Sequence, residues 1–156
     1  MTDGAIDLAP NASRFAPAPP EIVERWSKFP SWDRPYFPNV VGLQLEEIRT
    51  DYARMRMPYR PDLEQPAGVL HGGAISTLID TVVVPAVGQA YELGWAYLTI
   101  QMEVRFRSAI VGQDAIAEGW VEQRGRSILY CRAEVRAADG TVAADGTLVY
   151  TVRPPR

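Results

Sequence analysis

The chain has 156 residues, with 16 lysines and arginines against 19 aspartates and glutamates, which leaves a net charge of -3. With 47% hydrophobic and 22% charged residues it has the composition of an ordinary globular protein, and its length suits one domain with its own core. The mildly acidic balance provides no basic surface, so it argues against nucleic acid or an anionic membrane as a partner.

Cysteine and histidine usage excludes several kinds of site. Cys131 and His71 are the single cysteine and the single histidine, which rules out an internal disulfide, a cysteine-based zinc site and a multi-histidine metal site. No basic segment followed by an apolar one marks the N-terminus as a signal peptide. The longest apolar stretch, residues 82–87, is far below the roughly 20 residues that span a membrane. We therefore expect a cytoplasmic protein without a metal, a cofactor or a membrane partner.

The N-terminal segment differs in composition from the rest of the chain. Residues 1–20 contain four prolines among small residues, which predicts a flexible arm, followed by a single domain over residues 21–153. Residues 21–26 can form a short helix. The aromatic and proline cluster from Phe29 to Pro38 has two interpretations: it covers an apolar surface as an irregular segment, or some of its rings line a ligand pocket.

Alternation of apolar and polar residues predicts most of the remaining chain to be strands. Asp139-Gly140 is a typical two-residue hairpin sequence, so the last three alternating runs are expected to form an antiparallel meander. Cys131 lies within this alternation and is expected to be a small core residue. The predicted strands cover residues 41–45, 52–57, 97–106, 115–123, 128–137 and 141–152.

One long helix is expected, from His71 to at least Val84. Its apolar residues cover most of its surface, and its polar residues are mostly small, so the helix must be buried. Pro85 is expected to kink or end it, and Gly88 weakens any continuation. One buried helix among about six strands predicts an α+β protein in which the sheet wraps around the helix, the hotdog fold.

The start of this helix carries the residues best suited to chemistry. Gly72 and Gly73 allow close approach of a ligand, and the first N–H groups of a helix have no partner within it, so they can bind an oxyanion. Asp80 lies eight residues after Gly72, and a carboxylate in an apolar helix must be solvated or hydrogen-bonded. Oxyanion donors and a carboxylate together suit acyl transfer to water. Taken singly, Asp80 and His71 can equally be structural, and the two glycines can serve packing alone.

The sequence Gly68–Thr81 resembles the PaaI-like branch of the hotdog acyl-CoA thioesterases, the family that includes the phenylacetyl-CoA and 4-hydroxybenzoyl-CoA enzymes. The resemblance covers roughly residues 38–152. It implies that the Gly72 N–H binds the oxyanion and that Asp80 acts as base or nucleophile. Gln65, seven residues before Gly72, would position the attacking group, and Thr99 would support the acid. A threonine that another subgroup carries one turn beyond the acid is absent here.

The resemblance also implies how coenzyme A is bound and how the chain assembles. Arg107 lies in a stretch where relatives often have Arg-Pro, and Arg126 with Ser127 lies near where relatives contact the coenzyme A phosphates. Exposed arginines at strand ends are commonly just solvated, so this assignment stays open. Relatives pair their sheets into homodimers, often assembled into homotetramers, in which the acid of one subunit faces the helix start of the other.

These features together predict an acyl-CoA thioesterase that hydrolyses an acyl- or aryl-CoA thioester to the free acid and coenzyme A. Hotdog hydratases and dehydratases need a catalytic histidine in another arrangement, whereas His71 lies inside the thioesterase motif. The remaining alternative is a non-catalytic acyl-CoA-binding module on the same fold. The acyl group depends on whether Tyr59, Trp95, Tyr97 and the N-terminal aromatic residues reach the site.

Overall fold

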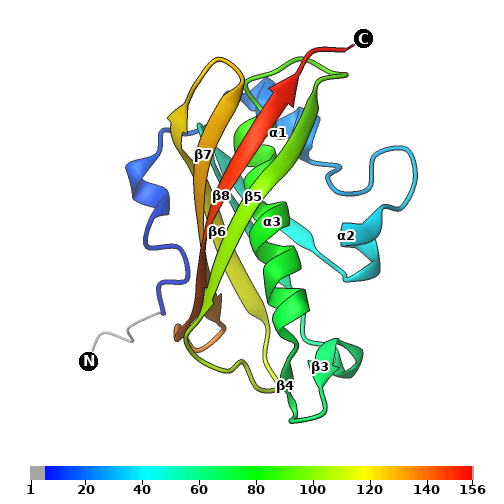
Figure 1. Ribbon diagram of the computed structural model, residues 1–156, viewed down its shortest axis with the longest axis vertical. Coiled ribbons are helices and arrows are strands. Elements are labelled where there is room, and N and C mark those ends of the chain that lie inside the picture. The colour runs from blue at the N-terminus through cyan, green and yellow to red at the C-terminus, as the bar shows by residue number, and fades with distance from the viewer. Residues whose placement is uncertain (1–5, 156) are drawn as a thin grey trace.

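The computed structural model describes residues 6–155, in which a six-stranded antiparallel sheet curves around one long helix (Figure 1). This confirms the expected α+β hotdog fold. Along the sheet the strands follow the order β1-β2-β6-β7-β8-β5, so the predicted meander of β6, β7 and β8 is confirmed. The helix is α3 (Gly72–Gly88), and the strands are β1 (Gln44–Arg49), β2 (Tyr52–Met57), β5 (Ala96–Phe106), β6 (Ala115–Arg124), β7 (Ile128–Ala137) and β8 (Val142–Arg153).

The shorter elements precede α3 in the chain. Two of them form a small separate hairpin, β3 with β4, which leads directly into α3. Strands of two residues are too short to show any periodicity, so the sequence gives no signal for them. The short elements are η1 (Ala12–Arg14), α1 (Pro20–Trp26), α2 (Phe37–Val40), η2 (Pro61–Leu63), β3 (Glu64–Gln65) and β4 (Val69–Leu70).

Helix α3 packs directly on the sheet because two strands carry glycine beneath it. A Cβ atom on Gly119 of β6 would lie 2.7 Å from Cγ1 of Val82, and one on Gly146 of β8 would lie 2.7 Å from Cγ2 of Ile79. Both helix residues have no exposed surface. The helix is therefore buried as its sequence predicts, and the sheet has no room for a side chain at either glycine.

The helix does not end at Pro85 but continues for three residues to Gly88. A proline inside a helix removes one N–H donor, and here the turn that follows is still closed by the Gln89 N–H, which donates to the Pro85 carbonyl at 3.2 Å. Gly88 is required there, because a Cβ would lie 2.6 Å from the Trp26 ring and 2.9 Å from the Tyr97 ring.

The β7–β8 hairpin has a longer loop than the two residues expected at Asp139-Gly140. Residues 138–140 form the turn, and the Ala137 N–H donates to the Thr141 carbonyl at 2.9 Å. Gly140 has a φ of 89°. A three-residue loop that ends in a left-handed glycine is the next most common hairpin connection after the two-residue loop, so the turn sequence was recognised but its length was wrong.

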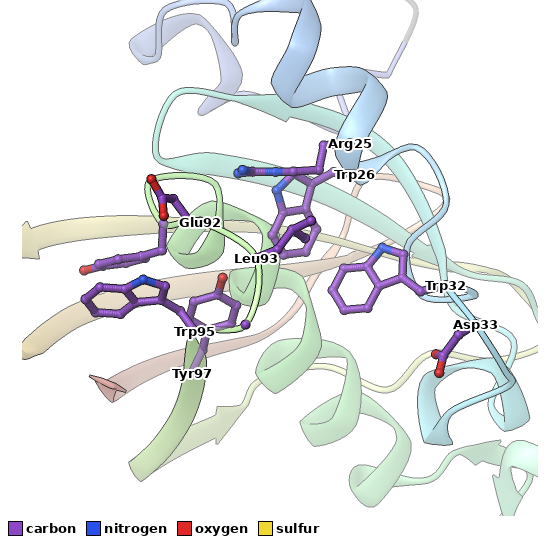
Figure 2. A pocket seen from close by; sticks show the side chains of 10 residues that line it. Arg25, Trp26, Trp32, Asp33, Glu92, Leu93, Trp95 and Tyr97 are labelled. Carbon is purple, nitrogen blue, oxygen red and sulfur yellow. The ribbon is translucent and has the colours of Figure 1, made fainter. Parts of the chain in front are cut away.

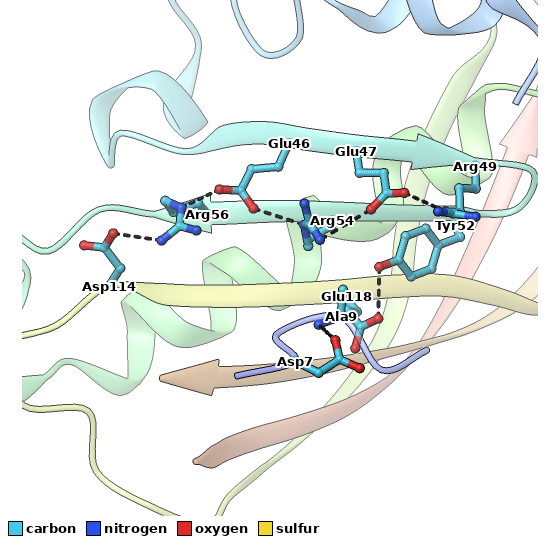
Figure 3. Close-up of polar contacts among 10 residues, drawn as sticks. All are labelled: Asp7, Ala9, Glu46, Glu47, Arg49, Tyr52, Arg54, Arg56, Asp114 and Glu118. Carbon is cyan, nitrogen blue, oxygen red and sulfur yellow. Dashed lines mark hydrogen bonds and ion pairs between the residues drawn. The ribbon is translucent and has the colours of Figure 1, made fainter. Parts of the chain in front are cut away.

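The N-terminal segment that we expected to be a flexible arm packs on the outer face of the sheet over residues 9–17. Asn11 donates two hydrogen bonds to the Glu118 carboxylate, both at 3.0 Å, and the ring of Phe15 stacks on Tyr52 at 5.1 Å. Glu118 also accepts a 2.9 Å bond from the Tyr52 hydroxyl (Figure 3). A buried carboxylate on the outer face of the sheet needs hydrogen-bond partners. The composition of residues 1–20 does not reveal that this segment provides them.

The β1 edge of the sheet is protected by charge and by the N-terminal segment. Arg54 of β2 lies 3.0 Å from Glu46 of β1, and Arg56 bridges Glu46 to Asp114, at 3.0 Å from the latter (Figure 3). Pro17 forms a bridge with Arg49, the last residue of β1. Charge and a covering segment are common devices that keep an edge strand from pairing with another chain.

The β5 edge has the opposite character. Leu98, Ile100 and Met102 expose 48%, 57% and 39% of their surface, and Phe106 at the end of the strand exposes 57%. The strand is 11 residues long and pairs only with β8 among the described residues. A long, apolar, unpaired edge is rare in a protein that stays monomeric.

Candidate active site

Asp80 lies in the middle of α3 and is held by hydroxyl groups from two strands. The Thr99 hydroxyl of β5 donates to Oδ1 of Asp80 at 2.7 Å. The Tyr150 hydroxyl of β8 lies 2.7 Å from the Asp80 carbonyl oxygen and 3.1 Å from the same Oδ1. Thr99 and Tyr150 are directly paired across the two strands. Within residues 6–155 all hydrogen bonds to this carboxylate go to Oδ1, so Oδ2 remains available for a reacting group.

Tyr150 is the residue of this group that the sequence analysis missed. It is almost fully buried, and burial raises the pKa of its hydroxyl well above the usual value, with the negative charge of Asp80 as the next cause. Tyr150 therefore remains a proton donor to Asp80 at any working pH. The sequence contains only a weak signal for this role. Tyr150 occupies an inward position of its alternating strand, where an aromatic residue is most simply interpreted as part of the core.

His71 is the N-cap of α3. Its Nδ1 accepts a hydrogen bond from the Gly73 N–H at 2.8 Å, and its carbonyl oxygen accepts from the Ala74 N–H at 2.9 Å. Because Nδ1 is an acceptor, neutral His71 carries its proton on Nε2. The Gly72 N–H has no acceptor among the hydrogen bonds of the described residues. One free N–H thus remains at the positive end of the helix, where it suits an oxyanion.

Gln65 and Arg107 lie at the same end of the helix as Gly72. All three line one cavity of about 310 Å³. The β3–β4 hairpin, in which Gln65 pairs with Val69, carries Gln65 there. The Phe106 ring is in the same cavity and would lie 3.3 Å from a Cβ atom at position 72, so glycine allows the end of β5 to approach the helix start.

The structure separates the expected catalytic residues into two groups within one chain. Asp80 and Thr99 form one group, and Gly72 and Gln65 form the other. Eight residues of helix, at about 1.5 Å each, place Asp80 about 12 Å beyond Gly72. One thioester carbonyl cannot contact both groups in a single chain.

The residues expected to bind coenzyme A are also separated. Arg107 follows β5, next to the cavity at Gly72, and its Nε lies 2.5 Å from Oδ1 of Asp145, a carboxylate with 11% exposed side chain. Arg126 and Ser127 are exposed in the turn between β6 and β7, at the other end of the sheet, where the Ser127 carbonyl accepts from the Val152 N–H at 3.0 Å.

The described part of the chain offers neither a cysteine nucleophile nor a cluster of metal ligands. Cys131 is 2% exposed, as expected for a core residue, and burial raises the pKa of its thiol to about 12, so it is not a nucleophile. Residues 6–155 contain no group of three or more histidine, cysteine, aspartate or glutamate side chains arranged to hold a metal ion. No helix among these residues is both long and apolar enough to cross a membrane.

The aromatic cluster at residues 29–38 fits both of its interpretations in part. Phe29 and Trp32 pack on Trp26, with ring centroids 5.5 and 5.4 Å away. Trp26 and Trp32 also line a second cavity, of about 420 Å³, together with residues that follow α3 (Figure 2). Tyr59 lies elsewhere, with its hydroxyl 3.1 Å from Glu64.

Solved structures with the same fold come from several bacteria. The thioesterase HI1161 of Haemophilus influenzae has a TM-score of 0.75 and 20% identity, covering 85% of this chain and 90% of its own. The PaaI protein of E. coli, from the phenylacetic acid degradation operon, has a TM-score of 0.69 and 16% identity, covering 76% and 84%. A hypothetical thioesterase of Streptococcus pneumoniae, solved with coenzyme A, has a TM-score of 0.66 and 19% identity, covering 74% and 88%.

Sequence comparison identifies the family directly. No curated protein matches the chain at a significant level. Residues 67–144, half of the chain, match the family model of the thioesterase superfamily. The matched region contains Gly72, Asp80 and Thr99, whereas Gln65 and Tyr150 lie outside it. The match confirms the family resemblance expected from the sequence between Gly68 and Thr81, and the chain belongs to the thioesterase superfamily.

Proposed function

We propose that the protein hydrolyses an acyl-CoA thioester to the free acid and coenzyme A, in a site shared by two copies of the chain. The observation that carries this proposal is the Asp80 carboxylate. Two hydroxyl groups hold one of its oxygens, and the other oxygen is left without a hydrogen bond among the described residues. A fixed carboxylate with one free oxygen is what a general base or a carboxylate nucleophile requires.

The β5 edge supports the shared site. A second copy that pairs with β5 through a two-fold axis must run antiparallel to it, so the start of one strand lies beside the end of the other. Thr99, near the start of β5, holds Asp80, and Phe106, at its end, packs on Gly72. Pairing of this kind brings Asp80 of one copy toward Gly72 of the other. The separation of about 12 Å between Gly72 and Asp80 within one chain then no longer prevents one carbonyl group from contacting both.

The proposed reaction uses these two groups in sequence. The free oxygen of Asp80 takes a proton from a water molecule, whose oxygen attacks the thioester carbonyl carbon. The negative oxygen that forms accepts a hydrogen bond from the Gly72 N–H of the second copy. When this intermediate collapses, the carbon–sulfur bond breaks and the proton passes from Asp80 to the departing coenzyme A thiolate. In the alternative route Asp80 itself attacks, and water then hydrolyses the mixed anhydride.

The other predicted site residues take positioning roles in this proposal. Thr99 orients the acid, and His71 holds the first turn of α3 through its bond to Gly73. Gln65 shares the cavity of Gly72 and orients the attacking water or the carbonyl group. None of these three side chains needs to exchange a proton with the substrate.

Arg107, Arg126 and Ser127 are proposed to bind the coenzyme A phosphates. Arg107 and Arg126 lie at opposite ends of one sheet, and antiparallel pairing of two sheets brings Arg107 of one copy toward Arg126 of the other. The coenzyme A in the Streptococcus pneumoniae neighbour supports a coenzyme A site on this fold. Arginine matches the geometry of phosphate oxygens.

Release of coenzyme A, followed with a thiol reagent, tests the proposed activity. We expect turnover of benzoyl-CoA or hexanoyl-CoA by the purified chain, and loss of that turnover in Asp80→Asn. Tight binding of both thioesters without any release of thiol would instead favour the non-catalytic binding module. Hydrolysis in water enriched in ¹⁸O tests the nucleophilic route: in a single turnover the label enters Asp80 only if Asp80 attacks and water then opens the mixed anhydride at the Asp80 carbonyl carbon.

Light scattering tests the assembly. We expect the homodimer as the smallest active unit and the homotetramer as the state in solution. An active monomer would contradict the shared site. Replacing exposed Ile100 of β5 with lysine places a charge on the proposed contact, so it should shift the protein toward monomers and reduce turnover in the same proportion.

A further inference from the structure

The second cavity is an aromatic chamber at the C-terminal end of α3 (Figure 2). Its volume of about 420 Å³ falls within the range of small-molecule sites, which commonly start at about 300 Å³. Neither Asp80 nor Thr99 lines the chamber, so it is separate from the residues that we propose to hydrolyse the thioester. Half of its ten lining residues are aromatic: Trp26, Trp32, Tyr91, Trp95 and Tyr97.

The aromatic rings of the chamber form two groups whose members are tilted against one another. The planes of Trp26 and Trp32 are inclined by 57°, with ring centroids 5.4 Å apart. The plane of Tyr91 is inclined by 31° to that of Trp95 and by 40° to that of Tyr97, with centroids at 4.8 and 5.9 Å. Tilted rings cover one another's faces less than parallel rings do, and Trp32 exposes 47% of its surface. The face of an aromatic ring is negative and attracts a cation.

Carboxylates outnumber positive charges in the lining of the chamber. Asp33 and Glu92 line it, against Arg25 alone. Neither carboxylate forms an ion pair with a lysine or an arginine among residues 6–155. Asp33 accepts a 2.8 Å hydrogen bond from the Tyr36 hydroxyl, which lowers the pKa of its carboxyl, so Asp33 is ionised at neutral pH. The two carboxylates are therefore available to a positive ligand and oppose a negative one.

Arg25 and Arg124 are already bound to carbonyl groups at the end of α3. Arg25 donates to the Gln89 carbonyl at 2.8 Å, and Arg124 donates to the Val87 carbonyl at 3.3 Å. The C-terminal end of a helix carries partial negative charge, which both arginines offset. The Arg124 guanidinium also lies 5.4 Å from the ring centroid of Tyr91. One ring of the chamber thus already contacts a cation.

We infer that the chamber binds a small organic cation whose alkylated ammonium group lies against the rings, near Glu92 and Asp33. Rings and carboxylates together select this class of ligand, because a neutral molecule gains nothing from the carboxylates and an anion is repelled by them. A quaternary ammonium group fits better than the ammonium group of a lysine, because it has no N–H donors that lose their water on binding. The inference concerns a second ligand and goes beyond the proposed thioesterase activity.

Two probes of the same shape test whether the positive charge is recognised. In dimethylbutanol, the neutral analogue of choline, a carbon atom replaces the charged nitrogen. Calorimetric titration of the purified chain should give a Kd about tenfold lower for choline than for this alcohol. Trp32→Leu should remove most of the difference, and Trp32→Phe should keep most of it. Tyr130→Leu is the control, because it changes a similarly exposed aromatic residue on β7.

Charge substitutions of opposite sign test the role of the carboxylates. Glu92→Gln should raise the Kd of choline about two- to fivefold, and Arg25→Gln, which retains an N–H donor, should lower it by a similar factor. Neither variant should change the Kd of the neutral alcohol. Glu122→Gln is the control, because it changes an exposed carboxylate of β6 that does not line the chamber. The denaturation midpoint of each variant establishes that it is folded.

Three outcomes would overturn the inference. The first is the absence of saturable choline binding, and the second is an equal Kd for choline and the alcohol. The third is a reversal of the charge effects, with weaker choline binding in Arg25→Gln and tighter binding in Glu92→Gln. All three are measured by binding alone, so they do not depend on whether the chain hydrolyses a thioester.

Discussion

The Thr99 hydroxyl donates to Oδ1 of Asp80 at 2.7 Å and so joins the edge strand β5 to the middle of the central helix. Tyr150, which pairs with Thr99 across β5 and β8, reaches the same oxygen at 3.1 Å. The orientation of the acid therefore depends on the strand at which we propose that two copies meet.

Loss of the Asp80 carboxylate should lower kcat more than loss of the hydrogen bond that Thr99 donates to it. Asp80→Asn keeps the shape but removes the base, so kcat should fall about 10²–10⁴-fold while the denaturation midpoint stays unchanged. Thr99→Val removes one hydrogen bond to a charged group, so kcat should fall about 10–100-fold with KM nearly constant. Thr151→Val on β8 is the matched control, and steady-state kinetics with one thioester compares all three. Full activity of Asp80→Asn would exclude the proposed mechanism.

The oxyanion donor can be removed without breaking the helix. Gly72 is the first residue of α3, where proline is tolerated, and its neighbour His71 has the extended backbone that precedes proline. Gly72→Pro deletes the N–H group, so kcat should fall about 10²–10³-fold. Gly72→Ala retains the N–H and serves as the control.

Mixing the two inactive chains tests whether the site is shared. Refolding Asp80→Asn together with Gly72→Pro should produce mixed dimers with one intact site, which recover a fraction of activity that neither parent shows. If purified mixed dimers remain inactive, each site is built within one chain.

The phosphate contacts should appear as salt-dependent binding. Arg126→Ala is expected to raise KM for an acyl-CoA with little change in kcat, and the difference from wild type should be largest at low salt, where screening is weakest. A short thioester that lacks the nucleotide should show no difference. Arg153→Ala, which changes an exposed arginine at the same end of the sheet, is the control. Equal losses on both substrates would point to a structural role.

The buried Glu118 should make stability fall as pH rises. Burial raises the pKa of its carboxyl above the ordinary value of 4.5, despite hydrogen bonds from Asn11 and Tyr52 that lower it. The folded state then binds more protons than the unfolded state above pH 4.5, so the contribution of Glu118 declines through that window. Urea denaturation of wild type and Glu118→Gln at pH 4, 6 and 8 should show the variant gaining relative stability with pH. A constant difference would contradict the assignment.

The contact between α3 and β6 has no room for a methyl group at Gly119. A Cβ at Gly119 would lie 2.7 Å from Cγ1 of Val82, 2.9 Å from Cγ1 of Val83 and 3.1 Å from the Val82 backbone. Gly119→Ala should therefore destabilise the protein by about 1–3 kcal/mol, measured by urea denaturation. Combining it with Val82→Ala should recover part of this loss, because the smaller side chain makes room. Additive losses would show that the backbone contact dominates.

Periodicity was sufficient to predict β2, β5 to β8 and the buried helix, because burial repeats every two residues in a half-buried strand and every turn in a helix. It placed the first strand too early, at residues 41–45, whereas β1 spans Gln44–Arg49. It also located Gly72 and Asp80 at the start and the middle of that helix. Pro85 indicated approximately where the helix ends, but its exact end depends on packing around Gly88. Asp139-Gly140 indicated the position of the hairpin turn, but the length of its loop depends on the pairing of β7 with β8.

The sequence alone therefore determined the fold class and the residue types at the helix start, since both are local patterns. Tertiary structure alone decided which distant groups meet: Tyr150 with Asp80, Gln65 with Gly72, and Asn11 with Glu118. It also brought Trp32 and Trp95 into the lining of one cavity. Such contacts depend on strand order and register across many residues. A one-residue change of register would turn Tyr150 of β8 or Glu118 of β6 to the other face of the sheet.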